Sequence, residues 1–310
     1  MINRILIRII VVQVLYSHLI NKDDTLETTK ARLKDSLDKA YELYYYLLTL
    51  PIELTKLQER RIEAAKGKYM PSEEEMNPNM RFVDNSFVNS LMLSQPLQEM
   101  VKAFSLTWNE DEVYLRLILD KILKSDIYEE YMTKESVSDN DDIEFWRQVM
   151  KKVVLPDEDL AELLESKSVY WNDDIDIVGT FVVKTIKRFA SDEEMPFLPQ
   201  YKDEEDAQFA ELLFVNAVKN KERYMELIDK FVKKSSWDTE RLAFMDVVIL
   251  YVALAELEKV PSVPAVVTIN EFVEMAKCYS TPNSGQFING ILYSIIKHLK
   301  NEGLLNKSLD

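Results

Sequence analysis

The chain is poor in glycine, cysteine and histidine. Its 310 residues include 5 glycines, 1 cysteine and 2 histidines, whereas an average usage of about 7% would give about twenty glycines. Glycine supplies the positive φ of tight turns and lets a backbone approach a phosphate, so its scarcity argues against sandwiches, barrels and nucleotide-binding βαβ folds. Cys278 alone excludes an intrachain disulfide framework, and with His18 and His298 it cannot build a His/Cys zinc site. The composition predicts a soluble, helical, cytoplasmic protein with no visible catalytic apparatus and no metal or cofactor.

Long hydrophobic runs are also scarce. Residues 5–20 are largely apolar, but polar side chains interrupt the run at Arg8, Gln13, Ser17 and His18. The run is therefore too short and too polar to span a bilayer. It is also a poor signal peptide, because no small-residue cleavage site follows it. We expect a buried first helix that carries Arg4 and Arg8 on one face, and no membrane partner.

The charge is strongly acidic but unevenly placed. The chain has 38 Lys and Arg against 54 Asp and Glu, a net charge of −16. Residues 135–206 hold 20 acids and 8 bases, a net −12, and the remaining residues hold 34 acids and 30 bases. Phosphate contacts need Lys and Arg, so a uniformly acidic protein is a poor nucleic-acid binder. The concentration of the acids in one segment weakens that objection.

Helical periodicity recurs along most of the chain. In residues 25–50 apolar side chains return at steps of three to four, and we expect Pro51 to end this helix. Another helix is expected to end at Gly67. Further helices are expected near 83–103, 110–125, 142–154, 157–167, 173–190, 205–219, 221–234, 238–258, 264–279 and 284–301. Residues 191–206, with two prolines and seven acids, are interpreted as a linker.

Two blocks near the C-terminus carry the most specific signal, residues 264–277 and 284–292. Pro264 suits the start of a helix, and Ser284 suits the N-cap of the next one. In that second helix the apolar residues follow helical spacing and predict a buried stripe: Ile288, Ile291, Ile295 and Leu299. The two blocks therefore predict a pair of amphipathic helices joined by a short connection.

Three small or polar residues occur within these helices at positions that need a structural explanation. Gly290 costs about 1 kcal/mol relative to alanine in a helix, so we expect a neighbouring backbone to pack closely against it. Asn270 and Asn289 are flanked by apolar residues, and we expect both side chains to form hydrogen bonds that hold a helix–helix corner.

These blocks resemble the signature of the NusB family of transcription antitermination factors. The matching C-terminal segments are Val263-Pro264, Ile269-Asn270-Glu271, Glu274-Met275-Ala276-Lys277 and Phe287-Ile288-Asn289-Gly290-Ile291-Leu292. Two further segments resemble the first helix and a later helix of the family: Val12-Gln13-Val14-Leu15-Tyr16-Ser17, and Asp246 to Ala253 with Glu256-Leu257. The C-terminal resemblance covers about residues 205–300, and the first helix adds about twenty residues.

The resemblance implies an all-α fold, a NusB-like helical bundle of two packed subdomains with an additional helical region. The expected organisation has four parts. These are the first helix of the NusB-like fold at 1–22, an extra or diverged helical region at 23–204 that ends in the acidic linker, a NusB-like C-terminal domain at 205–302, and a tail at 303–310.

The resemblance also implies a function. Members of the family pair with a small-subunit ribosomal protein that doubles as the elongation factor NusE. Together they bind single-stranded boxA RNA on nascent transcripts and support antitermination by the transcription elongation complex, notably on ribosomal RNA. The resemblance implies neither catalysis nor a small-molecule substrate.

Site residues are carried over only at matching positions. Arg4 and Arg8 fall in the arginine-rich first helix of the family, where their expected role is phosphate contact. The loop and helix start that face RNA correspond to Tyr279, Asn283, Ser284, Gln286, Phe287 and Asn289. There, aromatic rings can stack on unpaired bases and the helix N-terminus can receive a phosphate. Positions near the partner protein are Tyr16, Asp246 and Glu256.

The chain departs from the family pattern where positive charge is expected. Gln286 replaces the usual lysine, Tyr251 replaces the usual arginine, and the arginine cluster is thinned to Arg4 and Arg8. A helical scaffold that keeps the fold but has lost RNA binding is therefore the alternative function.

Two charged regions outside the matching segments remain open to two readings. The cations Arg60, Arg61, Lys66 and Lys68 are either an ordinary helix-end cluster or a replacement for the thinned first-helix arginines. The acidic residues 135–206 are either a solvated surface and linker, or a segment that mimics nucleic acid or docks a basic ribosomal protein.

An enzymatic reading comes from RNA cytosine methyltransferases, some of which carry a similar domain. Such an enzyme needs a cofactor-binding α/β domain with a glycine-rich loop and catalytic cysteines. Five scattered glycines and Cys278 alone argue strongly against it.

Overall fold

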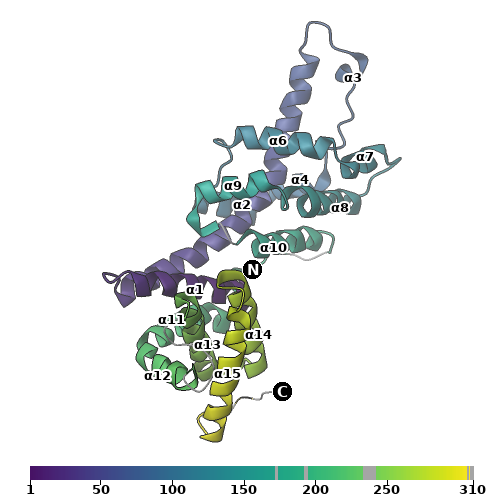
Figure 1. Cartoon of the computed structure of the whole chain (residues 1–310). Helices are drawn as coiled ribbons and strands as arrows, with labels where there is room; N and C mark the ends of the chain where they lie inside the picture. The colour runs from purple at the N-terminus through teal and green to yellow at the C-terminus, as the bar shows by residue number, and fades with distance from the viewer. Residues whose placement is uncertain (172–173, 192–194, 233–241, 306, 308–310) are drawn as a thin grey trace. The chain divides into compact units, whose positions relative to one another are not determined.

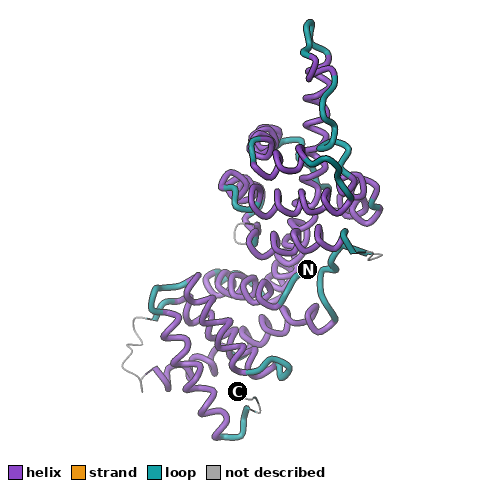
Figure 2. The backbone as a smooth tube through the Cα atoms, turned by 90° about the vertical axis from the view of Figure 1, so that its right-hand side faces the viewer, coloured by secondary structure: helices purple, strands orange, loops and turns teal. Residues whose placement is uncertain are grey.

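The structure is a computed structural model, and it describes residues 1–171, 174–191, 195–232, 242–305 and 307. Throughout these residues the regular elements are helices joined by loops (Figure 2), which confirms the all-α prediction. The chain divides into two compact units. We call Ile2–Leu37 with Tyr201–Asp310 the terminal unit, and Met1 with Asp38–Gln200 the middle unit. None of the described helices combines the length and hydropathy that a bilayer crossing requires.

The terminal unit is built around one helix that is buried on all sides. Its helices are α1 (Arg4–Ile20), the start of α2 (Leu26–Lys66), α11 (Glu204–Lys219), α12 (Lys221–Val232), α13 (Phe244–Lys259), α14 (Ala265–Tyr279) and α15 (Ser284–Asn301). Every residue of α13 from Val248 to Leu257 is buried, as expected for a helix that is apolar all round. Helices α1, α11, α12, α14 and α15 all pack against it.

Helices α14 and α15 lie along each other (Figure 1). The predicted stripe of α15 is buried, at Ile288, Ile291, Ile295 and Leu299, and α14 begins directly after Pro264 as expected. The N-cap prediction is wrong by one residue. Asn283 holds the cap position without a side-chain cap bond, while the Ser284 side chain turns inward and is buried.

The expected roles of Gly290, Asn270 and Asn289 are also wrong. A Cβ at Gly290 would meet no atom within 4 Å, whereas one at Gly285 would lie 2.9 Å from Cγ of Lys277. The close approach therefore occurs at Gly285. Asn270 and Asn289 are exposed, so water can satisfy their amides and no helix corner depends on them.

The middle unit holds the rest of α2 and a series of shorter helices. They are α3 (Glu73–Met76), α4 (Ser86–Leu93), α5 (Gln95–Phe104), α6 (Glu112–Leu123), α7 (Asp126–Thr133), α8 (Asp139–Val149), α9 (Glu158–Lys167) and α10 (Ile175–Arg188), with a π-helical turn at Met150–Val154 and a 3₁₀ turn at Val169–Trp171. The helix expected near 83–103 is interrupted at Ser94, whose side chain caps α5. The ends expected near residues 173, 234 and 238 lie outside the described residues.

Pro51 does not end a helix, because α2 continues through it for 41 residues in all. A proline inside a helix removes one backbone hydrogen bond and costs about 3 kcal/mol or more. Its neighbours Leu50 and Leu54 are fully buried, and burial of an apolar side chain contributes about 1.5–3 kcal/mol. Tertiary packing along α2 therefore outweighs the local cost of the proline. The predicted stop at Gly67 is confirmed, since α2 ends at Lys66.

Aromatic rings form much of the core of the middle unit. The ring of Tyr46 stacks on Trp108 with centroids 4.0 Å apart, and its hydroxyl donates a 2.8 Å hydrogen bond to the buried Asp111. Nζ of Lys167 lies 2.8 Å from the same carboxylate. Burial and this contact with Asp111 raise the pKa of Tyr46 well above its ordinary value.

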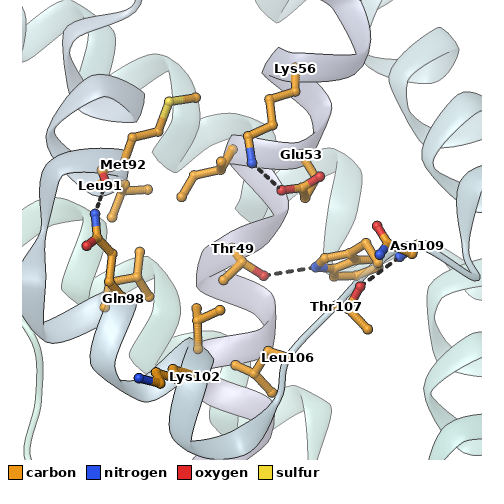
Figure 3. Close-up of a pocket in the computed structure, with 14 residues that line it drawn as sticks. Thr49, Glu53, Lys56, Leu91, Met92, Gln98, Lys102, Leu106, Thr107 and Asn109 are labelled. Atoms are coloured by element: carbon orange, nitrogen blue, oxygen red, sulfur yellow. Dashed lines mark hydrogen bonds and ion pairs between the residues drawn. The ribbon is translucent and has the colours of Figure 1, made fainter.

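A hollow of about 440 Å³ lies beside this core, between α2 and α5 (Figure 3). The indole N–H of Trp108 donates a 2.9 Å hydrogen bond to Oγ1 of Thr49 in its wall. The acid in its lining, Glu53, is paired with Lys56 at 2.8 Å (Figure 3). The polar groups of the wall are thus largely engaged with each other.

Candidate nucleic-acid interface

Arg8, expected at a phosphate, lies inside the terminal unit. Its side chain projects from α1 toward α13, and the residue is 3% exposed. Nε and Nη2 donate hydrogen bonds of 2.7 and 3.1 Å to the two carboxylate oxygens of Glu256. This two-bond geometry is among the strongest side-chain contacts that proteins form.

Glu256 is the centre of a buried polar cluster. It is fully buried, and its carboxylate also accepts a 2.8 Å hydrogen bond from the hydroxyl of Thr268 on α14. Its backbone carbonyl accepts a 2.9 Å hydrogen bond from Nζ of Lys307. Burial lowers the pKa of Lys307 to about 8. The cluster thus joins α1, α13, α14 and the C-terminal segment.

Arg4, one turn earlier on α1, is held by the first turn of α11. Its Nε lies 2.6 Å from Asp206 and its Nη2 lies 2.9 Å from Glu205. Burial would lower the pKa of Arg4, but the hydrogen bonds to Asp206 and Glu205 outweigh it and raise this pKa. The guanidinium also stands over the ring of Phe209, 4.9 Å from its centroid.

The placement of both arginines corrects the expectation that they contact phosphates. Arg8 would have to leave a buried carboxylate to reach a phosphate, and breaking such a pair costs about 3–5 kcal/mol. The charge of Arg4 is already balanced by two acids. The sequence reading missed Glu205 and Asp206 because it assigned residues 191–206 to a linker. The available signal was Asp203, an N-cap residue followed by an acidic first turn.

Two of the three residues expected near a partner protein face the interior as well. Glu256 and Asp246 are buried. Tyr16 is half-buried, and its ring lies 5.3 Å from that of Phe244. These positions can influence a partner surface through the packing of α1 and α13, but the two carboxylates do not reach it.

Ser284 and Asp246 form a second buried contact, at the start of α15. The Ser284 hydroxyl donates a 2.9 Å hydrogen bond to Oδ2 of Asp246. The same hydroxyl oxygen accepts a 3.1 Å hydrogen bond from the backbone N–H of Thr281. Within the described residues Oδ1 of Asp246 is buried without a hydrogen-bond partner. Ser284 therefore anchors the connection between α14 and α15 to α13.

The remaining expected RNA contacts are divided between core and surface. Phe287 is buried in the core and Tyr279 is half-buried. Asn283, Gln286 and Asn289 are exposed. The structure thus keeps the polar residues of this set accessible and places Phe287 in the core.

Exposed residues continue along the same face of α15. Gln286, Asn289, Tyr293 and Lys297 are all exposed, and their spacing of three and four residues places them on one side of a helix. We call these four residues the α15 stripe. Tyr293, with 53% of its surface exposed, and Lys297 were missed in the sequence reading. The helical spacing from Gln286 predicts that both residues lie on the exposed side of the helix. This spacing was used only to identify the buried side.

The α15 stripe offers groups suited to an unpaired nucleic-acid strand. Amide side chains can hydrogen-bond to base edges, and an exposed tyrosine can stack on a base. Helix α15 has no acidic residue in its own first turn, but the buried carboxylate of Asp246 lies at its start and offsets part of its dipole. No cluster of three or more His, Cys, Asp or Glu suited to a metal ion occurs in the part of the chain that the structure describes.

Comparison with known proteins places the similarity in the C-terminal half of the chain. A model of the NusB family matches residues 173–297. The transcription antitermination protein NusB of Salinibacter ruber is 35% identical over 142 residues, which are 46% of this chain and 82% of that protein. The protein of the same name from Symbiobacterium thermophilum is 35% identical over 127 residues, 41% of this chain and 82% of the relative. That of Bacillus cereus strain B4264 is 42% identical over 92 residues, 30% of this chain and 69% of the relative.

No solved structure matches the chain. The family assignment therefore rests on the sequence relatives, of which two are covered over most of their length. The all-helical terminal unit, with α13 at its centre, agrees with the fold that the resemblance implied. The chain is a member of the NusB family, with an additional helical region.

Proposed function

We propose that this protein is a transcription antitermination factor that binds boxA-type single-stranded RNA together with a NusE-type ribosomal protein during ribosomal RNA transcription. The observation that carries the proposal is the similarity to most of the length of relatives named as transcription antitermination proteins. The family model matches residues 173–297, which run from α10 into α15. We take α1 as the first helix of the family fold and the helices from α2 to α9 as the added region. A role of this kind requires binding surfaces and no catalytic group, and its partners are found in the cytoplasm.

The α15 stripe and Asn283 are the proposed RNA contacts. Their amides and the ring of Tyr293 fit unpaired bases, but Lys297 is the one cation of the stripe. Phosphate neutralisation supplies much of the affinity of nucleic-acid binding. We therefore expect weak RNA binding by the protein alone and much tighter binding when a basic ribosomal protein is bound beside it.

The direct test is an anisotropy titration of labelled boxA-type RNA at low salt, with and without a NusE-type ribosomal protein. We expect binding in the presence of the partner and a preference of at least about tenfold, or 1.4 kcal/mol, over a scrambled RNA. If boxA RNA is not bound in either case, the RNA part of the proposal is wrong.

Variants of the stripe locate the surface. Asn289→Ala with Tyr293→Ala should weaken RNA binding, because both side chains are exposed and removing them leaves the core intact. Gln286→Lys restores the residue usual in the family and should strengthen binding and its salt dependence. Gln208→Ala, a change at an exposed amide on α11, is the matched control and should change nothing.

A protein-interaction scaffold is the second candidate. The observation that favours it is that both first-helix arginines are paired with acids of the same unit. A scaffold would bind the ribosomal protein with an affinity that RNA does not change. Calorimetric titration of the ribosomal protein, with and without boxA RNA, separates the two candidates.

A further inference from the structure

A concave surface lined with arginines lies in the middle unit, between the second half of α2 and α6. Its volume is about 410 Å³. It is lined by Leu57, Arg60, Arg61, Ala64, Glu112 and Arg116. We call this surface the arginine groove. It is separate from the α15 stripe, since it belongs to the other compact unit.

The guanidinium groups of the arginine groove are accessible. Arg60 and Arg116 are exposed and Arg61 is half-buried. Ala64, one turn after Arg60 on α2, also lines the groove. Unlike Arg8, these arginines can reach an external ligand without leaving a protein interior.

The acids near the groove only partly neutralise it. Arg61 lies 2.6 Å from Asp120 and Arg116 lies 2.8 Å from Glu112. Arg60 forms no ion pair or side-chain hydrogen bond within the described residues. Exposed ion pairs contribute little to stability, so a ligand anion can replace the carboxylates. The lining of the groove holds three arginines and one acid, Glu112, in a chain of net charge −16.

The chemistry of the groove fits phosphate. Arginine presents a planar fork of N–H groups that matches the oxygens of phosphate, and it binds them with two parallel hydrogen bonds. A single small anion would need fewer cations than the three arginines of the groove. Three arginines from two helices suit the successive phosphates of a strand.

An exposed aromatic residue follows the end of the same helix. Helix α2 extends past α6 (Figure 1) and ends at Lys66. It is followed by Tyr69, which is fully exposed. Lys66 is paired with Glu63 at 2.8 Å, and Lys68 is paired with Glu75. Basic surfaces combined with exposed aromatic rings are typical of proteins that bind single strands, because every base can stack on such a ring.

We propose that the arginine groove and Tyr69 form a second binding surface for single-stranded RNA, on the helical region added to the family fold. Arg60, Arg61 and Arg116 contact phosphates, and Tyr69 stacks on a base. The surface has little specificity for RNA sequence, because its contacts are to the RNA backbone and to the π face of one base. This inference rests on the proposed role in RNA binding and extends it: the α15 stripe selects the site, and the groove adds affinity for the flanking strand.

The test uses the full chain and a labelled oligouridylate of twelve nucleotides, without any ribosomal protein, in anisotropy titrations at 50 and 200 mM salt. Arg60→Gln with Arg116→Gln should weaken binding at 50 mM at least about tenfold and reduce the salt slope by about 1.4, the value for two phosphate contacts on a single strand. Tyr69→Ala should weaken binding with little change in the salt slope. Glu112→Gln, which frees Arg116, should strengthen it.

The control variant is Lys151→Gln with Lys152→Gln. It removes the same charge from two exposed residues of the same unit, so it measures the effect of net charge alone. If the groove variant and this control lose the same affinity, or if Glu112→Gln has no effect, the groove is not an RNA site and an acidic protein becomes its better occupant. Binding of oligouridylate that depends on the groove, without recognition of boxA RNA, would support this inference and contradict the proposed function.

Discussion

The guanidinium of Arg8 holds the carboxylate of Glu256 through two hydrogen bonds, although the residues are 248 positions apart. Both side chains are buried, and Thr268 and Lys307 complete the cluster around Glu256. A first-helix arginine that the family resemblance assigned to RNA thus stabilises the terminal unit in this chain. The loss of basic residues at the proposed RNA face and the pairing of this arginine with an internal acid both reduce the positive charge available to RNA.

Removing one partner of this pair should be far more damaging than removing both. Glu256→Leu leaves Arg8 buried without its carboxylate, and we expect the free energy of unfolding to fall by about 3–5 kcal/mol. Arg8→Met with Glu256→Leu should lose less than either single variant, because two apolar side chains can pack together. Urea unfolding followed by circular dichroism measures all three. Equal or additive losses would show that the pair is not coupled.

Loss of the Ser284 hydroxyl should destabilise the α14–α15 connection. Ser284→Ala removes the 2.9 Å hydrogen bond to Asp246 and leaves a buried carboxylate without it, at an expected cost of about 1–3 kcal/mol. Ser294→Ala on the same helix removes only a hydroxyl bonded to the carbonyl of Gly290 and should stay within about 0.5 kcal/mol. Thermal unfolding of both variants compares them, and similar melting temperatures would argue against a structural role for Ser284.

The two glycines of α15 should respond differently to alanine. Gly290→Ala meets open space and should raise the free energy of unfolding by about 0.5–1 kcal/mol, because alanine has the higher helix propensity. Gly285→Ala places a Cβ 2.9 Å from Cγ of Lys277, so that side chain has to move and the gain should disappear. Denaturant midpoints of the two variants are the measurement. An equal gain at both positions would contradict the close approach at Gly285.

Lys307 should make the stability of the terminal unit depend on pH above neutrality. Burial lowers its pKa from 10.5 to about 8 in the folded state. Between these values the unfolded chain binds a proton that the folded chain does not, so the free energy of unfolding rises with pH from about 8 to 10.5. At pH 7.5 the folded state has to bury the charged ammonium group.

Lys307→Met isolates this effect from other titrations. The difference in unfolding free energy between the native protein and the variant should shift in favour of the native protein as the pH rises from 7.5 to 10. Denaturant unfolding at several pH values gives this difference. A difference that is constant with pH would show that Lys307 titrates normally.

Periodicity predicted most of the helices because it is a local property of the chain. The buried stripe of α15 and the start of α14 after Pro264 were readable in this way. Pro51 was misread, because its local cost is visible in the sequence and the burial of its neighbours along α2 is not. The first turn of α11 was misread for a similar reason. A run of acids suggests a linker, and the sequence does not show that an arginine from another helix lies beside these acids.

By itself, the sequence determined the helical class, the family and the buried stripe of α15, since these follow from composition, motif and spacing along one segment. Only the tertiary structure decided which charged residues are available. Arg4 and Arg8 are bound to acids more than two hundred residues away, whereas Arg60 remains exposed. The energy of an ion pair depends on the distance between the two groups in space and on the exclusion of water. The order of residues contains neither quantity, because both are set when the helices pack.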